Sequence, residues 1–306
     1  MFETGGPVVV LGDIMVDILI KPKGEIRPAS DTESIIHLGL GGQGANVAVQ
    51  LARLGVPVQL LARLGDDALG AVAMAALAQE GVAFPREPLA GQRTGALGVL
   101  VDVHGQRTMF PQHGANARLD EAFVRRHWPA AEPGASVAAP PAPRALFVSG
   151  YALLRESTRP AALWAMQAAR RRRIPVAVDP ASYALIEDVG PEAMLEWIGP
   201  ADIVLPNRDE GRVLTGSDDP DIMLERLAAR FAVVALKLDK DGARARAGAQ
   251  TCHVPAQPVT VVDTTGGGDA FNAGFLAAYL SGKPLADAVA VGVQAAAAVI
   301  QQIGST

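Results

Sequence analysis

Residues 259–275 read VTVVDTTGGGDAFNAGF, a pattern that predicts a strand, a Thr-Thr turn, three glycines and an aspartate before a helix. At a helix N-terminus, the backbone N–H groups of Gly266, Gly267 and Gly268 can surround an anion, and the helix dipole adds a favourable potential. Asp269 brings a negative charge to the same place, where it can cap the helix or act as a base beside a bound phosphate. The three preceding glycines leave room for a ligand and favour the base. The stretch is not a Walker P-loop, because no Gly-Lys-Ser/Thr follows.

A second glycine cluster, at residues 39–46, reads GLGGQGAN. Its residues Gly39, Gly41 and Gly44 match the G-x-G-x-x-G pattern of dinucleotide binding, with two aspartates downstream at 66–67. A dinucleotide fingerprint sits at the turn after the first strand of its unit, whereas this cluster lies well beyond the first expected strand. The structural alternative is a glycine-rich helix start that lets two backbones approach closely.

Strands and helices alternate along most of the chain, which predicts crossover units and a parallel sheet covered on both sides. The first strand is a short apolar run bounded by Gly-Pro and Gly-Asp, as expected for a strand buried on both faces. The expected strands are 8–11, 58–62, 145–148, 175–178, 203–205, 233–236 and 259–262. The expected helices are 45–54, 68–81, 159–172, 191–198, 220–230 and a long Ala-rich one over 270–302.

Two segments break this alternation, residues 14–38 and 94–112. Each contains apolar runs on either side of a polar turn, which is typical of hairpin-like strands, and we expect a small sheet at the edge of the main domain. The Pro/Ala-rich stretch 129–143 is expected to form an irregular surface connection.

Composition excludes several classes of protein. The 306 residues include 27 Lys and Arg against 32 Asp and Glu, so no excess positive charge is present to neutralise a nucleic-acid backbone. The single cysteine, Cys252, excludes an intramolecular disulfide and a multi-cysteine zinc site, and it favours a reducing compartment.

A membrane partner is also not expected, although the mean hydropathy is +0.21. No segment reaches the roughly 20 apolar residues that a spanning helix needs. The first residues lack the basic start of a secretory signal. We therefore expect a soluble, cytoplasmic protein.

Taken together and in this order, the two glycine clusters resemble the two signatures of the ribokinase-like (PfkB) carbohydrate kinases. The first signature corresponds to residues 41–46 and the second to residues 263–269, each with the helix that follows. The resemblance extends over essentially the whole chain, because intermediate segments are also similar to the family: 12–17, 64–70, 114–116, 178–182 and 207–210.

The resemblance implies a single α/β domain over residues 1–306, with a doubly wound, mostly parallel sheet flanked by helices. The segments 14–38 and 94–112 would form a small β-sheet lid. The implied activity is ATP-dependent phosphorylation of a hydroxyl of a small sugar. Sugar would lie between the lid and the first cluster, ATP would lie across the C-terminal half, and the γ-phosphate would meet the sugar hydroxyl at Asp269.

The resemblance also assigns roles to single residues. Asp269 would be the base that accepts the hydroxyl proton, and the Gly266–Gly268 N–H groups would stabilise the developing charge. Arg107, on a lid strand, is a candidate for substrate binding, and it could pair with the carboxylate if the substrate is a sugar acid. Taken alone, Asp17 could lie in a turn and Asn46 could cap a helix, which is a structural alternative to a role in sugar binding. The implied sugar-binding residues are Asp17, Gly41, Gly42, Gln43, Asn46, Arg107 and Asn116, of which Asp17 and Asn46 have that structural alternative.

The nucleotide and ion sites are implied in the same way. Glu210 would act on Mg²⁺ through water, since Mg²⁺ keeps much of its hydration shell. Asp263 and Thr265 would lie beside a monovalent cation such as K⁺. Because the sequence ends at 304–306, we expect the cage around that cation to be incomplete. The residues implied in nucleotide binding are Asn207, Lys237, Gly242, Thr264 and Gln294. Family members often carry Thr or Ser and another Gly in the loop where Lys237 and Gly242 stand.

Three other functions remain open on the sequence. A nucleoside kinase of the same fold would need aromatic surfaces for a base, and with 5% aromatics the candidates are Tyr151 and Phe110. A nicotinamide-binding oxidoreductase would use the first glycine cluster, and a regulatory binder would keep the site without catalysis. A homodimer formed through the lids would cover the exposed strand edges.

Overall fold

The computed structural model describes residues 6–102, 106–129, 142–302 and 304. The predicted surface connection 129–143 therefore lies outside the described residues over 130–141. Residues 103–105, where the sequence predicts the polar turn of the second segment, also lie outside them. Within the described part, the main sheet consists of β1 (Val8–Leu11), β4 (Val58–Leu61), β7 (Ala145–Ser149), β8 (Val176–Asp179), β9 (Ile203–Val204), β10 (Val233–Lys237), β11 (Ala243–Ala247) and β12 (Gln250–Val254).

The strand order in this sheet is β12-β11-β10-β9-β8-β7-β1-β4. All neighbours from β10 to β4 are parallel, while β11 and β12 add an antiparallel hairpin at one edge. The order runs outward in both directions from β1 and β7, so the sheet is doubly wound and mostly parallel, as predicted.

Strand β1 separates two hydrophobic cores. Its residues alternate between them: Val8 and Val10 belong to one core, and Val9 and Leu11 to the other. Because all four are fully buried, the strand has to be apolar on both faces. This explains the continuous VVVL run.

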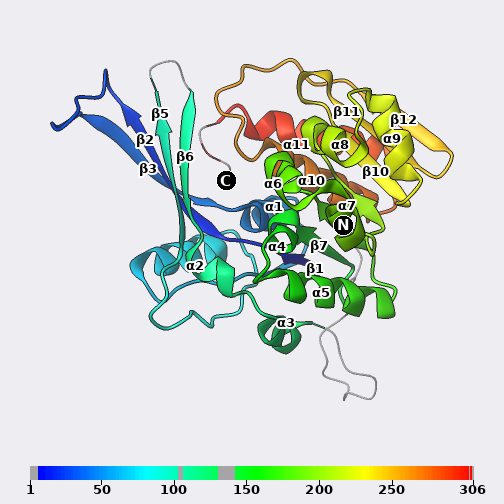
Figure 1. Cartoon of the computed structure of the whole chain (residues 1–306), viewed down its shortest axis with the longest axis horizontal. Helices are drawn as coiled ribbons and strands as arrows, with labels where there is room; N and C mark the ends of the chain where they lie inside the picture. The colour runs from blue at the N-terminus through cyan, green and yellow to red at the C-terminus, as the bar shows by residue number, and fades with distance from the viewer. Residues whose placement is uncertain (1–5, 103–105, 130–141, 303, 305–306) are drawn as a thin grey trace.

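Helices cover both faces of the main sheet (Figure 1). One face is packed by α1 (Gln43–Arg53), α2 (Ala68–Gln79), α10 (Gly267–Tyr279) and α11 (Leu285–Val299). The other face is packed by α3 (Glu121–His127), α4 (Gly150–Leu154), α5 (Arg159–Arg171), α6 (Tyr183–Val189), α7 (Pro191–Trp197), α8 (Arg208–Thr215) and α9 (Pro220–Ala228). The short 3₁₀ turns η1 (Gly114–Arg118) and η2 (Asp239–Asp241) complete the regular structure. No helix in the described ranges is long and apolar enough to cross a membrane.

A separate small sheet extends from this body (Figure 1). It contains β2 (Met15–Pro22), β3 (Ser34–Gly41), β5 (Gly95–Val101) and β6 (Arg107–Gln112) in the order β3-β2-β5-β6. Both segments that break the strand–helix alternation form it, so this prediction is confirmed. Several large apolar side chains on it face solvent, among them Ile36 and Phe110.

Two predicted elements are wrong. Residues 259–262 do not form a strand, because the hairpin β11–β12 already closes that edge of the sheet and Pro258 has no N–H to donate to a ladder. The single helix over 270–302 is instead two helices, α10 and α11. Gly282 takes a positive φ of 79° after α10, and Pro284 stands directly before α11.

Helices α10 and α11 pack closely because of a glycine. A Cβ on Gly274 would lie 2.8 Å from the carbonyl oxygen of Val291 and 2.9 Å from the Cβ of Ala295. We expect Gly274→Val to lower the free energy of unfolding by about 1–3 kcal/mol through overpacking, measured by urea denaturation. The matched control is Gly24→Val, since a Cβ on Gly24 meets nothing within 4 Å. Equal stability of the two variants would contradict this packing.

Candidate active site

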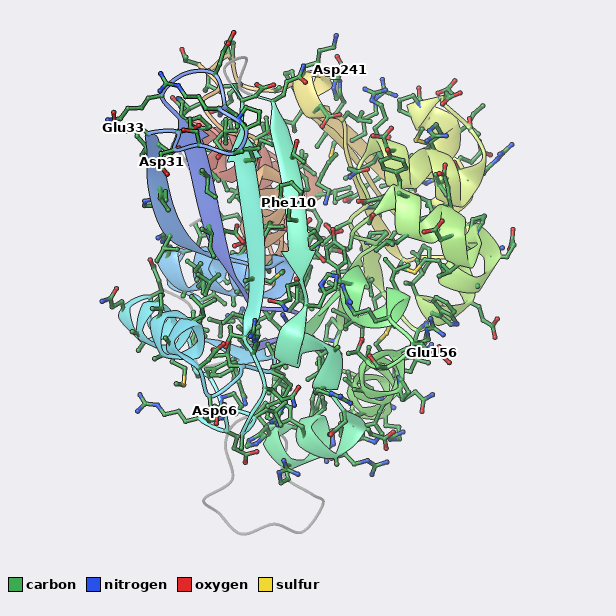
Figure 2. All side chains as sticks on the ribbon, turned by 60° about the vertical axis from the view of Figure 1, so that its left-hand side comes forward. Asp31, Glu33, Asp66, Phe110, Glu156 and Asp241 are labelled. Carbon is green, nitrogen blue, oxygen red and sulfur yellow. The ribbon has the colours of Figure 1, made fainter. Side chains whose placement is uncertain are left out.

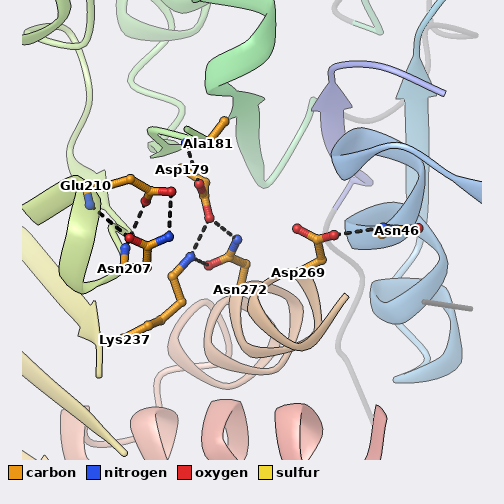
Figure 3. Close-up of polar contacts among 8 residues, drawn as sticks. All are labelled: Asn46, Asp179, Ala181, Asn207, Glu210, Lys237, Asp269 and Asn272. Carbon is orange, nitrogen blue, oxygen red and sulfur yellow. Dashed lines mark hydrogen bonds and ion pairs between the residues drawn. The ribbon is translucent and has the colours of Figure 1, made fainter. Parts of the chain in front are cut away.

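Polar side chains gather where the parallel strands of the main sheet end. Asp13 follows β1, Asp179 is the last residue of β8, and Lys237 is the last residue of β10. Because the carboxyl ends of parallel strands share one edge of a sheet, these groups meet there, opposite the N-terminus of α10. Figure 3 shows Asp179 and Lys237 of this group near Asp269.

The turn before α10 is built from glycines. Gly266 adopts the left-handed conformation with φ 78° at the N-cap, which directs the chain into the helix. A Cβ on Gly267 would lie 2.9 Å from the Ile300 side chain, whereas a Cβ on Gly268 would have only the Lys237 Nζ at 3.7 Å near it. The first N–H groups of a helix have no intrahelical partner. The turn therefore presents backbone donors and open space to the same side as Lys237.

Asp269 links the two glycine clusters. Its carboxylate accepts a hydrogen bond of 2.8 Å from the side-chain amide of Asn46, on α1 and 223 residues away in sequence (Figure 3). Burial raises the pKa of Asp269 to about 7, an effect that the Asn46 hydrogen bond opposes and the nearby Asp179 charge increases. A carboxyl group that titrates near neutral pH can accept a proton from a bound hydroxyl.

Asp17, on β2, faces the first cluster. A Cβ on Gly41 would lie 2.1 Å from the Asp17 Oδ1, so the chain can pass this carboxylate only as glycine. Burial, together with the charges of Asp13 and Asp263, raises the pKa of Asp17 to about 6. The buried Oδ1 has no hydrogen-bond partner among the residues that the structure describes. Such an acceptor suits a polar ligand with hydroxyl donors.

The other sugar-site residues are placed around the same loop. Gly42 has a positive φ of 91° and forms the N-cap of α1. The amide oxygen of Gln43 is buried and has no hydrogen-bond partner in the described part of the chain. Asn116 is used differently: its amide accepts from the Ile14 N–H at 3.0 Å and donates to the Ile14 carbonyl at 2.7 Å. Asn116 thus fixes the backbone between β1 and β2, which carries Asp13 and leads into the strand that carries Asp17.

Gly39 and Gly41 both lie in β3 of the small sheet. They do not form a turn after a strand of the main sheet, which is where a dinucleotide fingerprint would place them. The nicotinamide prediction therefore lacks its structural context.

A charged network lies on the other side of Asp269 (Figure 3). Lys237 Nζ is 2.5 Å from one carboxylate oxygen of Asp179 and 3.2 Å from the side-chain oxygen of Asn272. Asn272 in turn donates to Asp179 at 2.6 Å. Burial alone would lower the pKa of Lys237, but the carboxylates of Asp179 and Glu210 outweigh it and raise the pKa, so the ammonium stays charged.

Asn207 and Glu210 form a capping box at the start of α8. The Asn207 side chain accepts from the Glu210 N–H at 2.9 Å, and the Glu210 carboxylate accepts from the Asn207 N–H at 2.9 Å and from its side chain at 2.7 Å. Glu210 is 2% exposed. Burial and the neighbouring Asp179 raise its pKa, which Lys237 partly offsets.

A cavity of about 600 Å³ opens beside this network. Its polar end contains Asn207, Lys237, Thr264, Gly267 and Gly268, and its walls are largely apolar, from Val259, Val261, Phe271, Val293, Ala296, Ala297 and Ile300. Gly242, also in the lining, has φ 85°, and a Cβ there would lie 2.0 Å from the Val254 carbonyl oxygen. Gln294 is exposed, and α11 contributes its neighbour Val293 to the lining instead.

Arg107, the first residue of β6, crosses from the small sheet to the glycine turn. Its guanidinium lies 2.6 Å from the Asp263 carboxylate and also donates to the Thr265 hydroxyl. Asp263 accepts further hydrogen bonds from the N–H of Thr265 at 2.7 Å and of Gly304 at 3.1 Å. A narrow cavity of about 30 Å³ between the small sheet and the turn is lined by Asp17, Arg107, Asp263, Thr265 and Gly304, among others.

Three residues of this site were not predicted as site residues: Asp13, Asp179 and Asn272. Asp13 and Asp179 carried a signal, because each directly follows or ends an apolar strand of the parallel sheet. Tyr151, a candidate surface for a nucleoside base, lies near the carboxylates of the site. Burial raises the pKa of its phenol, and so do the charges of Asp13, Asp179, Asp269 and Glu210. Asn272 carries no local signal, since one buried amide on an Ala-rich helix has no distinctive spacing.

Comparisons with known proteins agree with this geometry. A family model described as pfkB family carbohydrate kinase matches residues 7–306. Fructokinase from Klebsiella pneumoniae is 35% identical over 286 residues, which cover 89% of this chain and 84% of that protein. Ribokinase from Haemophilus influenzae is 27% identical over 311 residues, covering 97% of this chain and 93% of that protein.

A solved structure is also similar. The crystal structure of adenosine kinase from Sinorhizobium meliloti superimposes with a TM-score of 0.83 and 26% sequence identity. The match covers 99% of this chain and 96% of that chain. The similarity therefore includes the small sheet as well as the main body.

The buried Asp269 carboxyl should make stability depend on pH. Its folded pKa of about 7 exceeds the ordinary 3.8, so between these values the folded chain binds the extra proton. The free energy of unfolding then falls as pH rises and levels off above the folded pKa. We expect Asp269→Asn to raise the melting temperature more at about pH 8 than at about pH 5, measured by calorimetry.

The control for this measurement is Glu156→Gln, which removes an exposed carboxylate (Figure 2). An identical shift for Asp269→Asn at both pH values would show that burial does not penalise the Asp269 charge.

Proposed function

The chain belongs to the pfkB family of carbohydrate kinases, and on that premise we propose that it transfers the γ-phosphoryl group of ATP to a hydroxyl of a small sugar, with Asp269 as the general base. One observation carries the proposal. The Asp269 carboxylate lies in the first turn of α10, directly after the glycine turn, and it is held by Asn46 of the other glycine cluster. A proton acceptor and a set of hydrogen-bond donors for an anion thus lie together between the two glycine clusters.

Phosphoryl transfer needs in-line positioning and stabilisation of charge more than covalent help from the protein. The Asp269 carboxylate would orient the attacking hydroxyl and accept its proton. The N–H groups of Gly266, Gly267 and Gly268 would donate to the transferred phosphoryl group as its charge develops, assisted by the dipole of α10. A preorganised donor of this kind typically contributes about 3 kcal/mol.

The cavity of about 600 Å³ supports a nucleotide site. Its apolar walls from α10 and α11 suit adenine, and its polar end, with Thr264 and the glycine turn, suits the phosphates. Lys237 lines the same end, and its ammonium, now paired with Asp179, is placed to donate to a phosphate oxygen. Gly242 would keep the loop close to the nucleotide. We assign Asn207 to this end and Gln294 to the outer rim.

Glu210 and Asn207 fit a site for hydrated Mg²⁺. Carboxylate oxygen is the ligand that this ion prefers, and the Glu210 carboxylate already accepts two hydrogen bonds from Asn207, so it would reach the ion through water. Mg²⁺ held here with ATP would offset the negative charge of the phosphates. In this arrangement, Glu210 orients the water ligands and Lys237 limits the build-up of negative charge beside them.

Sugar would bind between the small sheet and the first cluster. The unpartnered Oδ1 of Asp17 and the amide oxygen of Gln43 can accept from vicinal hydroxyls, while Gly41 and Gly42 allow the ring to come close. Arg107 is already paired with Asp263, which favours a neutral sugar over a sugar acid. A nucleoside is the second candidate acceptor. The single cysteine and the need for ATP fit a reducing, nucleotide-containing compartment such as the cytoplasm.

ATP consumption with Mg²⁺ tests this function against ribose, fructose, 2-keto-3-deoxygluconate, tagatose 6-phosphate, adenosine and inosine. We expect turnover of at least one neutral sugar. Asp269→Asn should lower kcat by about 10²–10⁴-fold, because it removes the proton acceptor, while leaving ATP binding unchanged. The control is Glu156→Gln, with normal turnover. Silence across the panel would refute the proposed activity, and selective turnover of adenosine would assign the nucleoside branch.

We also propose a homodimer formed through the small sheets. Ile35, Ile36 and Leu38 on β3, and Met109 and Phe110 on β6, are each at least half exposed, and both edges of the sheet are strands without a neighbour in the described structure. Figure 2 shows Phe110 midway along β6, with the charged Asp31 and Glu33 at the loop end of the sheet. A second copy would cover the apolar side chains and the free edges.

Light scattering should therefore give a mass of twice the 31.7 kDa chain. Ile36→Lys is expected to be monomeric, because the dimer would bury the lysine charge among apolar side chains and remove it from water. Val72→Lys, at an exposed position of α2 away from the small sheet, should leave the dimer intact. A parent protein that is monomeric at high concentration would contradict the proposal.

A further inference from the structure

Asp263 and Thr265, the residues expected beside a monovalent cation, already have hydrogen-bond and ion-pair partners within the protein. Asp263 is 4% exposed, and one of its oxygens contacts Arg107 and the Thr265 N–H while the other accepts from the Gly304 N–H. The Thr265 hydroxyl accepts from the same guanidinium. The described side-chain donors of this site therefore do not fit K⁺.

Nearby carbonyl oxygens are also engaged. The Ile300 carbonyl accepts from the N–H groups of Val262 at 2.8 Å and Asp263 at 3.2 Å, and the Thr264 carbonyl accepts from Gly267 at 3.3 Å. Both lone pairs of the Ile300 carbonyl are thus in use. A cation bound here would also lie beside the positive charge of Arg107. The charge balance of the site is met by Arg107 instead.

Arg107 connects the small sheet to the residues that precede the glycine turn. Arg107 belongs to the small sheet, and its side chain is only 18% exposed because it reaches into the cavity under that sheet. Thr265 directly precedes Gly266, whose left-handed conformation starts α10. By holding Asp263 and Thr265 together, the guanidinium limits the orientations that the following N–H groups can take. The small sheet thus stabilises the Gly266–Gly268 turn through the Arg107 side chain.

We propose that Arg107 is a positioning residue whose guanidinium stands in for a monovalent cation at Asp263 and couples the position of the small sheet to the order of the Gly266–Gly268 turn. The inference rests on the proposed phosphoryl transfer, for which the turn supplies the anion donors. It assigns Arg107 to the enzyme's own turn and not to a substrate carboxylate.

The first test compares rates in KCl and in tetramethylammonium chloride at equal ionic strength. The parent protein should show the same kcat in both. Arg107→Met, which keeps the length of the stem and removes the charge, should lose on the order of 100-fold in kcat with little change in the KM of the sugar, because a misplaced turn acts on the reacting group. K⁺ or a low, non-denaturing concentration of free guanidinium should restore part of the rate.

Arg107→Lys serves as the conservative variant, expected to fall between the parent and Arg107→Met because an ammonium keeps the charge but cannot bridge two partners in a fork. Arg27→Met is the matched control, since Arg27 is an exposed arginine in the loop between β2 and β3. It should behave as the parent does in both salts.

A second readout does not depend on turnover. The melting temperature of the substrate-free parent should be the same in the two salts, whereas that of Arg107→Met should rise in KCl because the ion now neutralises Asp263. This arm stays decisive even if every sugar in the panel fails, so a wrong assignment of the activity and a wrong assignment of Arg107 give different results.

Three results would overturn the inference. The first is stimulation of the parent by K⁺. The second is a loss in Arg107→Met that neither K⁺ nor guanidinium reduces. The third is a loss confined to the KM of an acidic substrate such as 2-keto-3-deoxygluconate, which would make Arg107 a substrate-binding residue.

Discussion

The central strands of this protein are buried on both faces, and the rest of the site follows from that constraint. A strand such as β1, with all four residues fully buried, has no position for a polar side chain along its length. Polar residues can appear only where the strands end, and in a parallel sheet those ends lie on one edge. Asp13, Asp179 and Lys237 gather there for this reason, and α10 presents its positive N-terminus to the same edge.

The resulting site concentrates negative charge. Asp17, Glu210 and Asp269 all have raised pKa values, chiefly because burial disfavours their ionised forms. Lys237 offsets part of this charge on one side, and Arg107 does so at Asp263 on the other. Such an arrangement weakens the folded protein, which is the usual relation between a preorganised site and stability. It is consistent with a site whose ligands bring hydroxyl donors and a cation-bound phosphate.

Glycines make this concentration possible by letting backbone and carboxylate approach each other. Gly41 passes the Asp17 carboxylate where no Cβ fits, and Gly12 and Gly44 let the end of β1 contact the start of α1. These approaches bring the small sheet and the start of α1 close to the end of β1. The ion pair from Arg107 to Asp263 then joins the small sheet to the segment that precedes the glycine turn.

Much of the fold could be predicted from the sequence. The period of apolar residues and the turns between them gave the central strands and most helices, and the break in this alternation located the small sheet. The glycine clusters and their resemblance to a kinase family pointed to Asp269 and Asn46, which the structure joins by a hydrogen bond. Local patterns failed where a neighbour decides the outcome: 259–262 is apolar enough for a strand, but the sheet edge beside it is already closed by β12.

The sequence by itself determined the fold class, the family and the residues of the two glycine clusters around Asp269, because these depend on periodicity and on motifs that are local in the chain. Tertiary structure alone decided the partners of the charged groups. Asn272 meets Asp179, and Arg107 meets Asp263, across 93 and 156 residues of sequence. Pairings of that kind depend on which side chains the fold brings within a few ångströms and removes from water, and no spacing along the chain encodes them.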